Sequence, residues 1–325
     1  MKKIWKLWLL SIVAVFMLAA CGGTATPDTP KIDDTPKEDV KKEDVVESAS
    51  PVTVTDSVGN EITLETAPAT IVSMTPSNTE ILFELGLSDE IIGVNDYDDY
   101  PAEALEKEKI GGMEFNVEKI VAMNPDIVFG HESGLSTGEA GYEQIRAAGI
   151  PVFIVKNATN FDETYTTIEE VGKLTGKTEE AEKIIAEMKE KVEEVLTKVA
   201  TVENKKTVFV ETSPAPEIYT AGKDTFMQEM FDMVGADNVA TEEGWFMIDP
   251  EAIISKNPDV IIVMYDYIET AVEDVYAREG FDTITAIKEK AVIQVQENIT
   301  SRTGPRLAEG LEAIAKAIYP EVFSE

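Results

Sequence analysis

The sequence predicts an α/β fold in which two similar lobes are joined by one long, rigid α-helix. A capped helix, an Asn-Pro-Asp stop and a buried strand are predicted at residues 116–128 and again at 249–261. Short β-branched runs alternate with helical patterns on both sides of the middle of the chain, which favours mostly parallel sheets covered by helices. Between the halves, residues 178–200 carry apolar side chains at helical spacing, and a helix of this length spans about 35 Å.

The chain has 325 residues, which is long enough for two domains with a sizeable core. Two long similar halves favour a two-lobed molecule, because solenoids need three or more short repeats. We predict five parts: a signal peptide (1–20), a lipidated cysteine with a disordered tether (21–51), an N-terminal lobe (52–160), linking helices (161–203) and a C-terminal lobe (204–325).

The first part is typical of a secretory leader. Lysines precede an apolar stretch from Leu7 to Leu18, and Leu-Ala-Ala-Cys ends at Cys21. The stretch is shorter than the roughly 20 apolar residues of a membrane span. Leu-Ala-Ala-Cys resembles the lipobox of bacterial lipoproteins, which implies cleavage before Cys21 and a lipid on its sulfur; an ordinary signal with an incidental cysteine is the alternative. We therefore expect the protein at the outer face of the bacterial cytoplasmic membrane, anchored through Cys21.

Composition limits the partners. The chain has 28 basic and 62 acidic residues and a formal net charge of −34, which repels nucleic acid and anionic membrane surfaces. Any membrane attachment is therefore expected to be covalent or hydrophobic. Residues 22–51 are rich in Thr, Pro, Asp, Glu, Lys and Ser without apolar periodicity, so they predict a tether with a reach of roughly 30 Å. Cys21 is the only cysteine, which excludes an intramolecular disulfide.

The N-terminal lobe is predicted to begin with a hairpin at 52–64, because two alternating runs flank a turn that contains Gly59. Four further strands are predicted from short β-branched runs, at 70–74, 91–94, 127–130 and 152–155. Three helices are predicted from apolar spacing, at 78–85, 117–123 and 142–148.

Two helices in the middle, at 162–174 and 178–200, are separated by a Thr-Gly-Lys break. The alternation then restarts with a strand at 207–211, which favours a strut between lobes over a surface helix of one domain. The remaining elements are helices at 225–234, 250–256 and 305–318 and strands at 260–264 and 292–295. We interpret 303–306 as the start of the last helix, with Pro305 at its first position, and give Arg306 no special role.

Several segments, taken in order, resemble a known family. Residues 71–86, with the sequence IVSMTPSNTEILFELG, resemble the opening of class III substrate-binding proteins of ABC importers for vitamin B12, ferric siderophores and haem. Residues 93–101 are similar to a segment typical of the vitamin B12 branch. Segments 124–126, 219–223 and 304–306 also match, so the resemblance covers about 52–319.

The resemblance implies the bilobed periplasmic-binding-protein fold, with two Rossmann-like lobes joined by one long helix. It also implies a monomer that captures a metal chelate and delivers it to a dimeric ABC permease with its ATPase. Cobalamin or another corrinoid is the first expectation, and a ferric siderophore or haem is the alternative. No cofactor is expected beyond this ligand.

Glu118 and Glu251 occupy matching positions in the first turn of the repeated helices. An acidic residue there stabilises a helix by about 0.3–1 kcal/mol through the helix dipole, which is one explanation. The family resemblance implies a second one: these glutamates, one per lobe, dock onto arginines of the permease, since Arg–carboxylate pairs fix register. The paired position in both lobes favours docking.

His131 is the only histidine, and it follows the strand predicted at 127–130. Ligands of open α/β sheets bind at the carboxyl ends of strands, so we expect it to line a pocket. It is suited to coordinate a metal within the ligand, to donate a hydrogen bond, or to act only as a polar loop residue. No second histidine or free cysteine exists to build a His/Cys metal site.

Aromatic residues gather at other strand ends and favour the exposed walls of a cleft for a flat ligand. The resemblance places 298–302 at the rim of the second lobe, and Arg302 is also suited to pair with an anionic siderophore. Tyr267 belongs to the same aromatic group. The side chains expected to line the ligand site are Tyr97, Tyr100, Met113, Phe115, His131, Trp245, Phe246, Tyr265, Asn298 and Arg302.

An enzyme is the rival class, and the sequence does not favour it. Nucleophilic catalysis needs an activated Ser or Cys with a base, and His131 has no Gly-x-Ser-x-Gly elbow beside it. Gly-x-Gly-x-x-Gly and the Walker pattern are absent from the sequence. Glu118 and Glu251 as a paired-carboxylate hydrolase site remain a remote alternative.

Overall fold

The computed structural model describes residues 51–324. The predicted signal peptide, Cys21 and nearly all of the predicted tether lie outside the described residues. Within 51–324, no helix has both the length and the apolar character needed to cross a membrane.

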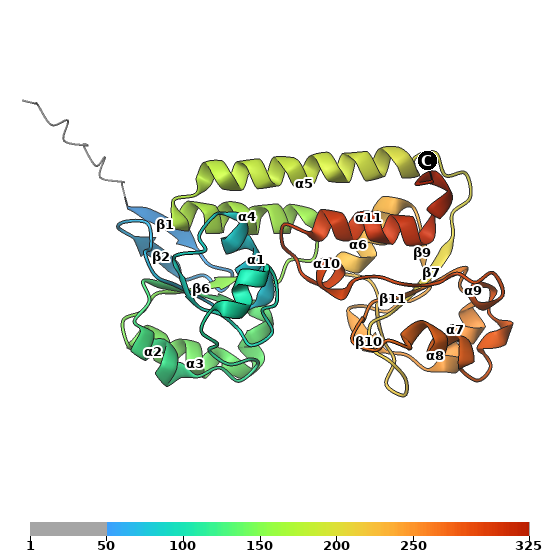
Figure 1. Cartoon of the computed structure of the whole chain (residues 1–325), viewed down its shortest axis with the longest axis horizontal. Coiled ribbons are helices and arrows are strands. Elements are labelled where there is room, and N and C mark those ends of the chain that lie inside the picture. The colour runs from blue at the N-terminus through green and yellow to red at the C-terminus, as the bar shows by residue number, and fades with distance from the viewer. Residues whose placement is uncertain (1–50, 325) are drawn as a thin grey trace, which may run out of the picture. The chain divides into compact units, whose positions relative to one another are not determined.

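The N-terminal lobe is built on a parallel sheet with the strand order β4-β3-β5-β6. Its strands are β3 (Ile71–Ser73), β4 (Ile91–Gly93), β5 (Ile127–His131) and β6 (Val152–Val155). The predicted hairpin precedes it as β1 (Val52–Thr55) and β2 (Glu61–Leu64). Helices α1 (Pro76–Glu84), α2 (Val117–Met123) and α3 (Leu135–Ala147) lie around the sheet (Figure 1).

The C-terminal lobe is built on a second parallel sheet with the order β12-β11-β7-β9. Its strands are β7 (Thr207–Glu211), β9 (Asp237–Asn238), β11 (Val260–Val263) and β12 (Val292–Gln294). A small antiparallel sheet joins β8 (Tyr219–Ala221) to β10 (Trp245–Met247). The helices are α6 (Phe226–Val234), α7 (Pro250–Lys256), α8 (Ala271–Ala277), α9 (Thr285–Lys288), α10 (Glu297–Ser301) and α11 (Leu307–Ile318).

Both parallel sheets reverse their strand order at the equivalent place. After β3 the chain adds β4 on one side and then crosses to add β5 and β6 on the other. After β7 it adds β9 on one side and then β11 and β12 on the other. A reversal of this kind leaves a crevice at the carboxyl ends of the strands, which is where ligands bind in open α/β sheets. Each lobe therefore offers one half of a binding site.

The repeated segment has the same structure in both lobes. Helices α2 and α7 each end at an asparagine with a left-handed backbone, Asn124 and Asn257, as the Asn-Pro pattern predicts. The aspartate two residues later accepts two hydrogen bonds from a threonine at or just before the start of the neighbouring strand. Asp126 accepts from the backbone N–H and hydroxyl of Thr70 at 2.9 and 3.0 Å, and Asp259 accepts the same pair from Thr207 at 2.9 and 2.8 Å. The sequence repeat is thus a structural repeat down to single hydrogen bonds.

Two helices connect the lobes: α4 (Phe161–Thr175) and α5 (Thr178–Val199). Figure 1 shows α5 running along both lobes, and α5 packs on α4 and on α11. The apolar face of α5 is formed by its buried side chains, which are Ala181, Ile184, Met188, Val192, Val195 and Val199. One hydrophobic cluster runs from Ile71 through this face to Leu311. The predicted α/β class with its long joining helix is therefore confirmed, and the helix is packed along its length rather than free-standing.

Three details differ from the sequence expectations. Helix α3 begins at Leu135, earlier than the predicted start at Tyr142, because its glycines serve packing rather than a loop. A Cβ at Gly138 or Gly141 would lie 2.7 or 2.6 Å from the ring of Phe115. The last helix begins at Leu307, so Pro305 lies in the turn before it. The elements β8, β9, β10, α8, α9 and α10 were not predicted, since all are short.

Candidate functional site

A cavity of about 510 Å³ lies between the two lobes, where the carboxyl ends of both parallel sheets meet. The N-terminal lobe contributes the start of α1 and the residues that end or follow β4, β5 and β6, including Tyr97, His131 and Asn157. The C-terminal lobe contributes Phe226, Asp266 in the loop after β11, and residues within 297–303, from α10 and the turn that follows it. A neighbouring hollow of about 270 Å³ shares Tyr97 and reaches Met113 and Phe115. These two hollows form the candidate site.

A larger hollow of about 1130 Å³ is lined, within the described part of the chain, only by residues between 201 and 322, so the N-terminal lobe contributes nothing to it. It runs from the amino-terminal ends of β7, β11 and β12, at Lys206, Asp259 and Ala291, along β12. The strand reversal directs ligands to the crevice at the carboxyl ends of the strands, where both lobes contribute. We therefore place the candidate site in the smaller cavity between the lobes.

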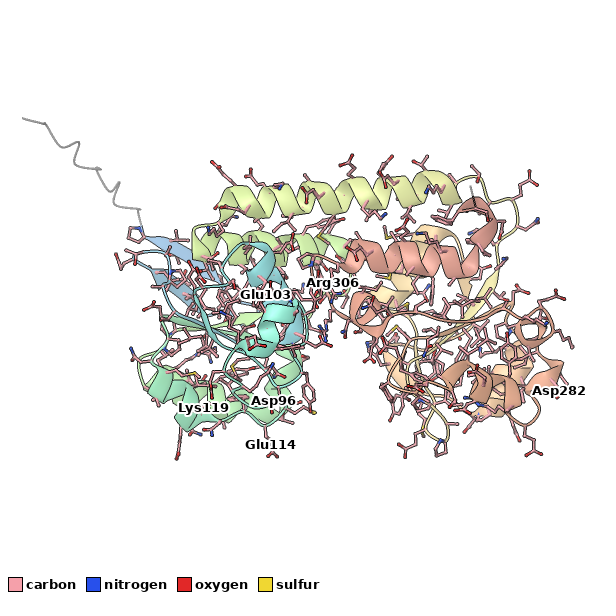
Figure 2. All side chains as sticks on the ribbon, in the orientation of Figure 1. Asp96, Glu103, Glu114, Lys119, Asp282 and Arg306 are labelled. Carbon is pink, nitrogen blue, oxygen red and sulfur yellow. The ribbon has the colours of Figure 1, made fainter. Side chains whose placement is uncertain are left out.

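A buried ion cluster forms the wall behind the cavity. Glu80, on α1, is 3% exposed, and its carboxylate accepts from Arg302 at 2.8 Å and from Arg306 at 2.6 and 2.8 Å. The ring of Tyr100 lies 3.6 Å from the Arg306 guanidinium, a cation–π contact outside the cavity, so this tyrosine does not line it as expected. Figure 2 shows Arg306 where the two lobes meet. The expectation that Arg306 has no special role is therefore wrong.

Asp99 extends this cluster to the surface of the cavity. Its carboxylate accepts from Arg302 at 2.7 Å and from the side-chain amide of Asn298 at 2.9 Å. Burial alone would raise the pKa of Asp99, but the hydrogen bonds from Arg302 and Asn298 outweigh it and lower the pKa below its usual value. Arg302 and Asn298, both expected to line the site, do so while they bridge the lobes.

His131 lies in the wall of the cavity and is 4% exposed. Its Nδ1 accepts from the backbone N–H of Ser133 at 3.2 Å and lies 2.8 Å from the Ser133 hydroxyl. Burial lowers the pKa of His131 to about 4, and the nearby Glu132 only partly offsets it. The imidazole is therefore neutral at pH 7.

The expected aromatic residues divide into two groups. Tyr97 lines the main cavity, and Phe115 and Met113 line the adjoining hollow. The exposed Trp245 lies outside both, although its ring packs 5.4 Å from that of Phe226, which does line the cavity. Phe246 packs against the core of the C-terminal lobe, and the exposed Tyr267 lies outside both hollows.

Tyr265 is a correction, because it is 1% exposed and forms no part of a cleft wall. Its hydroxyl donates to Glu211 at 2.8 Å, and Arg278 holds the same carboxylate from two nitrogens at 2.7 and 2.9 Å. A buried glutamate that needs partners thus draws the tyrosine inward. Burial and the charge of Glu211 raise the pKa of Tyr265 above its usual value.

Sequence reasoning missed Asp99, Phe226, Asp266 and Glu297, all of which line the cavity. Asp266 and Glu297 follow β11 and β12 closely, so the strand-end rule that selected His131 also identifies them. Among residues 51–324, no group of three or more His, Cys, Asp or Glu side chains is placed to hold a metal ion.

Glu118 and Glu251 do not meet in the cavity. Both are exposed, in the first turns of α2 and α7. The two helices belong to different lobes and lie on the side away from α5 (Figure 1). Lys119, labelled in Figure 2, marks the start of α2. An exposed carboxylate on each lobe is suited to contact another protein and unsuited to act jointly on one bond.

The chain is similar to proteins that bind solutes for transport. Residues 71–299 match a family model described as periplasmic binding protein. An uncharacterised ABC transporter substrate-binding lipoprotein of Bacillus subtilis (strain 168) is 39% identical over 328 residues, covering 100% of both chains. A cobalamin-binding protein of Halobacterium salinarum (strain ATCC 29341 / DSM 671 / R1) is 28% identical over 280 residues, covering 83% of this chain and 74% of that protein.

A solved structure has the same fold. It is that of a possible iron-binding (periplasmic solute-binding) protein from Staphylococcus epidermidis ATCC 12228. It superposes with a TM-score of 0.71 and 36% identity, covering 78% of this chain and 99% of the other.

Replacing Glu80 with alanine is expected to lower the free energy of unfolding by about 3–5 kcal/mol, because it leaves buried arginine charge without its main partner. Urea denaturation measures the change. Glu84→Ala, an exposed position on the same helix, is the matched control and should change stability by less than about 0.5 kcal/mol. Equal midpoints for the two variants would show that the cluster does not hold the lobes.

The contribution of His131 to the free energy of unfolding is expected to decrease as the pH is lowered from about 6.5 to about 4. The unfolded histidine has the higher pKa and binds the proton first, so acidification through this window favours unfolding, and the full stability is present above it. His131→Gln removes this titration. The wild-type stability minus that of the variant should therefore decrease by on the order of 3 kcal/mol from pH 7 to pH 4.

The subtraction is needed because Asp98 acts in the opposite direction. Burial raises the pKa of Asp98 to about 6, so its contribution is present at low pH and is lost as pH rises through 6. This contribution is shared by wild type and variant and cancels. A difference that does not change with pH would contradict a neutral His131.

Proposed function

Because the chain belongs to the periplasmic binding protein family, we propose that it is the substrate-binding lipoprotein of an ABC importer and that it captures a metal chelate. Cobalamin or another corrinoid is the first candidate. The observation that carries the proposal is the cavity between the lobes, at the carboxyl ends of both parallel sheets. The family supports this reading, and so does the cobalamin-binding relative.

The lining suits a large ligand with a flat apolar body and a polar edge. Tyr97, Phe115 and Phe226 provide aromatic surface, and the remaining lining is rich in hydrogen-bonding groups. Haem or a ferric siderophore is the second candidate, because the relative of known structure is named as a possible iron-binding protein. A hydrolase is not supported, because the named relatives are binding and transport proteins and the two exposed glutamates lie on separate lobes.

The proposed partner is a dimeric permease with its ATPase, which receives the loaded protein as a monomer. Glu118 and Glu251 are proposed to contact permease arginines, one from each lobe. Their exposure and their matching positions on repeated helices support this role. Cys21 is proposed to carry the lipid that holds the protein at the outer face of the cytoplasmic membrane.

Ligand binding is expected to raise the melting temperature. A ligand at 100 times its dissociation constant adds about 2.7 kcal/mol to the stability of the folded state. The measurement is a thermal-shift panel with cyanocobalamin, haem, and hydroxamate and citrate complexes of Fe³⁺. No shift with any of these chelates would rule out the proposed ligand class.

The double substitution Glu118→Ala with Glu251→Ala is expected to leave ligand affinity unchanged, because both carboxylates are exposed and lie outside the cavity. It is expected to abolish uptake, because it removes the proposed contacts with the permease arginines. Calorimetry measures affinity and labelled-ligand accumulation in cells measures uptake. Glu114→Ala with Glu273→Ala, which also removes one exposed glutamate from each lobe, is the control and should transport normally. Weakened ligand binding in the first double variant would argue against a docking role.

A further inference from the structure

Acidic side chains outnumber basic ones in the lining of the cavity, and they differ in whether they have an ion-pair partner. Among the described residues that line it, Arg302 is the only cation at pH 7, because His131 is neutral. Its Nη1 already lies 2.8 Å from Glu80 and 2.7 Å from Asp99. Glu80 is shared with Arg306, so the carboxylates of Glu80 and Asp99 balance the charges of the two guanidiniums. An anionic group on the ligand therefore finds no free cationic partner in this lining.

Two further carboxylates line the same cavity from the C-terminal lobe. Asp266 and Glu297 follow β11 and β12, and Asp266 accepts the backbone N–H of Glu297 at 3.4 Å. Neither makes an ion pair with a described residue. Burial and the charge of Asp266 raise the pKa of Glu297 above its usual value. Both side chains offer acceptor oxygens to a ligand that brings N–H or O–H groups.

His131 supplies the complementary group from the other lobe. A neutral imidazole has one donor nitrogen and one acceptor nitrogen. If a hydrogen bond makes one nitrogen the acceptor, the other nitrogen must carry the proton and is the donor. Nδ1 accepts from the backbone N–H of Ser133, which can act only as a donor. The proton therefore sits on Nε2. His131 is more than nine-tenths buried in the cavity wall, and no described residue hydrogen-bonds to Nε2.

From this arrangement we propose that the cavity recognises a chelate whose edge carries uncharged carboxamide groups, with His131 donating to amide oxygens and Asp266 and Glu297 accepting from amide N–H groups. The proposal rests on the proposed function and narrows its ligand class. A carboxamide has both a donor and an acceptor, so it satisfies both sides of the cavity at once. A carboxylate is an acceptor only and meets unpaired negative charge.

The same tautomer separates hydrogen bonding from metal ligation at His131. While Nε2 carries the proton, it has no lone pair for a metal. Ligation through Nε2 would require the proton to move to Nδ1, which lies 2.8 Å from the Ser133 hydroxyl, an acceptor for it. The proposal assigns His131 to the edge of the ligand, and the two roles give different results in the experiment below.

The test compares two corrinoids with the same ring, measured by isothermal titration calorimetry at pH 7 on the full chain. Dicyanocobinamide carries amides at its edge, and dicyanocobyrinic acid carries carboxylates in their place. We expect the amide form to bind at least about 100-fold more tightly, since burying a charge without a partner costs more than losing one hydrogen bond. Cyanide occupies both axial positions in each probe, so metal ligation does not contribute.

Variants assign the roles of the side chains. Asp266→Asn with Glu297→Gln should weaken dicyanocobinamide about tenfold and strengthen dicyanocobyrinic acid, because the repulsion is removed. His131→Ala should weaken dicyanocobinamide by a similar factor, and His131→Gln should restore it, because a glutamine amide replaces the Nε2–H donor. Glu190→Gln, an exposed site on α5, is the matched control and should bind like wild type.

The outcomes separate the two proposals. Tighter binding of dicyanocobyrinic acid, haem or ferric citrate than of dicyanocobinamide would overturn the carboxamide inference and leave the importer function standing. An absorption change of diaquocobinamide that is lost in His131→Gln would show metal ligation and would also overturn it. No binding of any corrinoid, haem or ferric chelate would overturn both.

Discussion

The shape of the candidate site depends on one buried carboxylate. Glu80 is removed from water on α1 of the N-terminal lobe, and a buried charge of this kind is costly unless it is paired and hydrogen-bonded. Its two partners, Arg302 and Arg306, come from the segment between α10 and α11 of the C-terminal lobe. The requirement to pair Glu80 therefore brings together residues more than 200 positions apart and sets the back wall of the cavity.

The apolar face of α5 supports the same arrangement from the opposite side. It packs on α4 and α11, and the hydrophobic cluster that includes Met188 extends into both lobes. Close-packed protein interiors resist deformation. The lobes are therefore held by this packing on one side and by the Glu80 ion pairs on the other. A cavity formed between two such supports is present before the ligand arrives, which is usual for small-molecule sites.

Local chemistry decided which features were predictable. The repeated Asn-Pro-Asp segment, the strand at Ile127–His131 and the α5 stripe each follow from neighbouring residues in the sequence, so their pattern predicted them. The inward turn of Tyr265 depends on Glu211 and Arg278, and the role of Arg306 depends on Glu80. The glycines of α3 resemble a loop until Phe115 is seen against them. Tertiary partners at long separation caused each of these errors.

The overall charge of the protein says little about the charge of its ligand. The 62 acidic residues are spread along the whole sequence. An exposed charge more than about 8 Å from the ligand is largely screened at physiological ionic strength. Only groups at the cavity act on the ligand at full strength. There Arg302 is already paired with Glu80 and Asp99, and two more carboxylates, Asp266 and Glu297, line the space without an ion pair. Selection against anionic edges thus arises from the pairing of Arg302, a feature that neither composition nor net charge records.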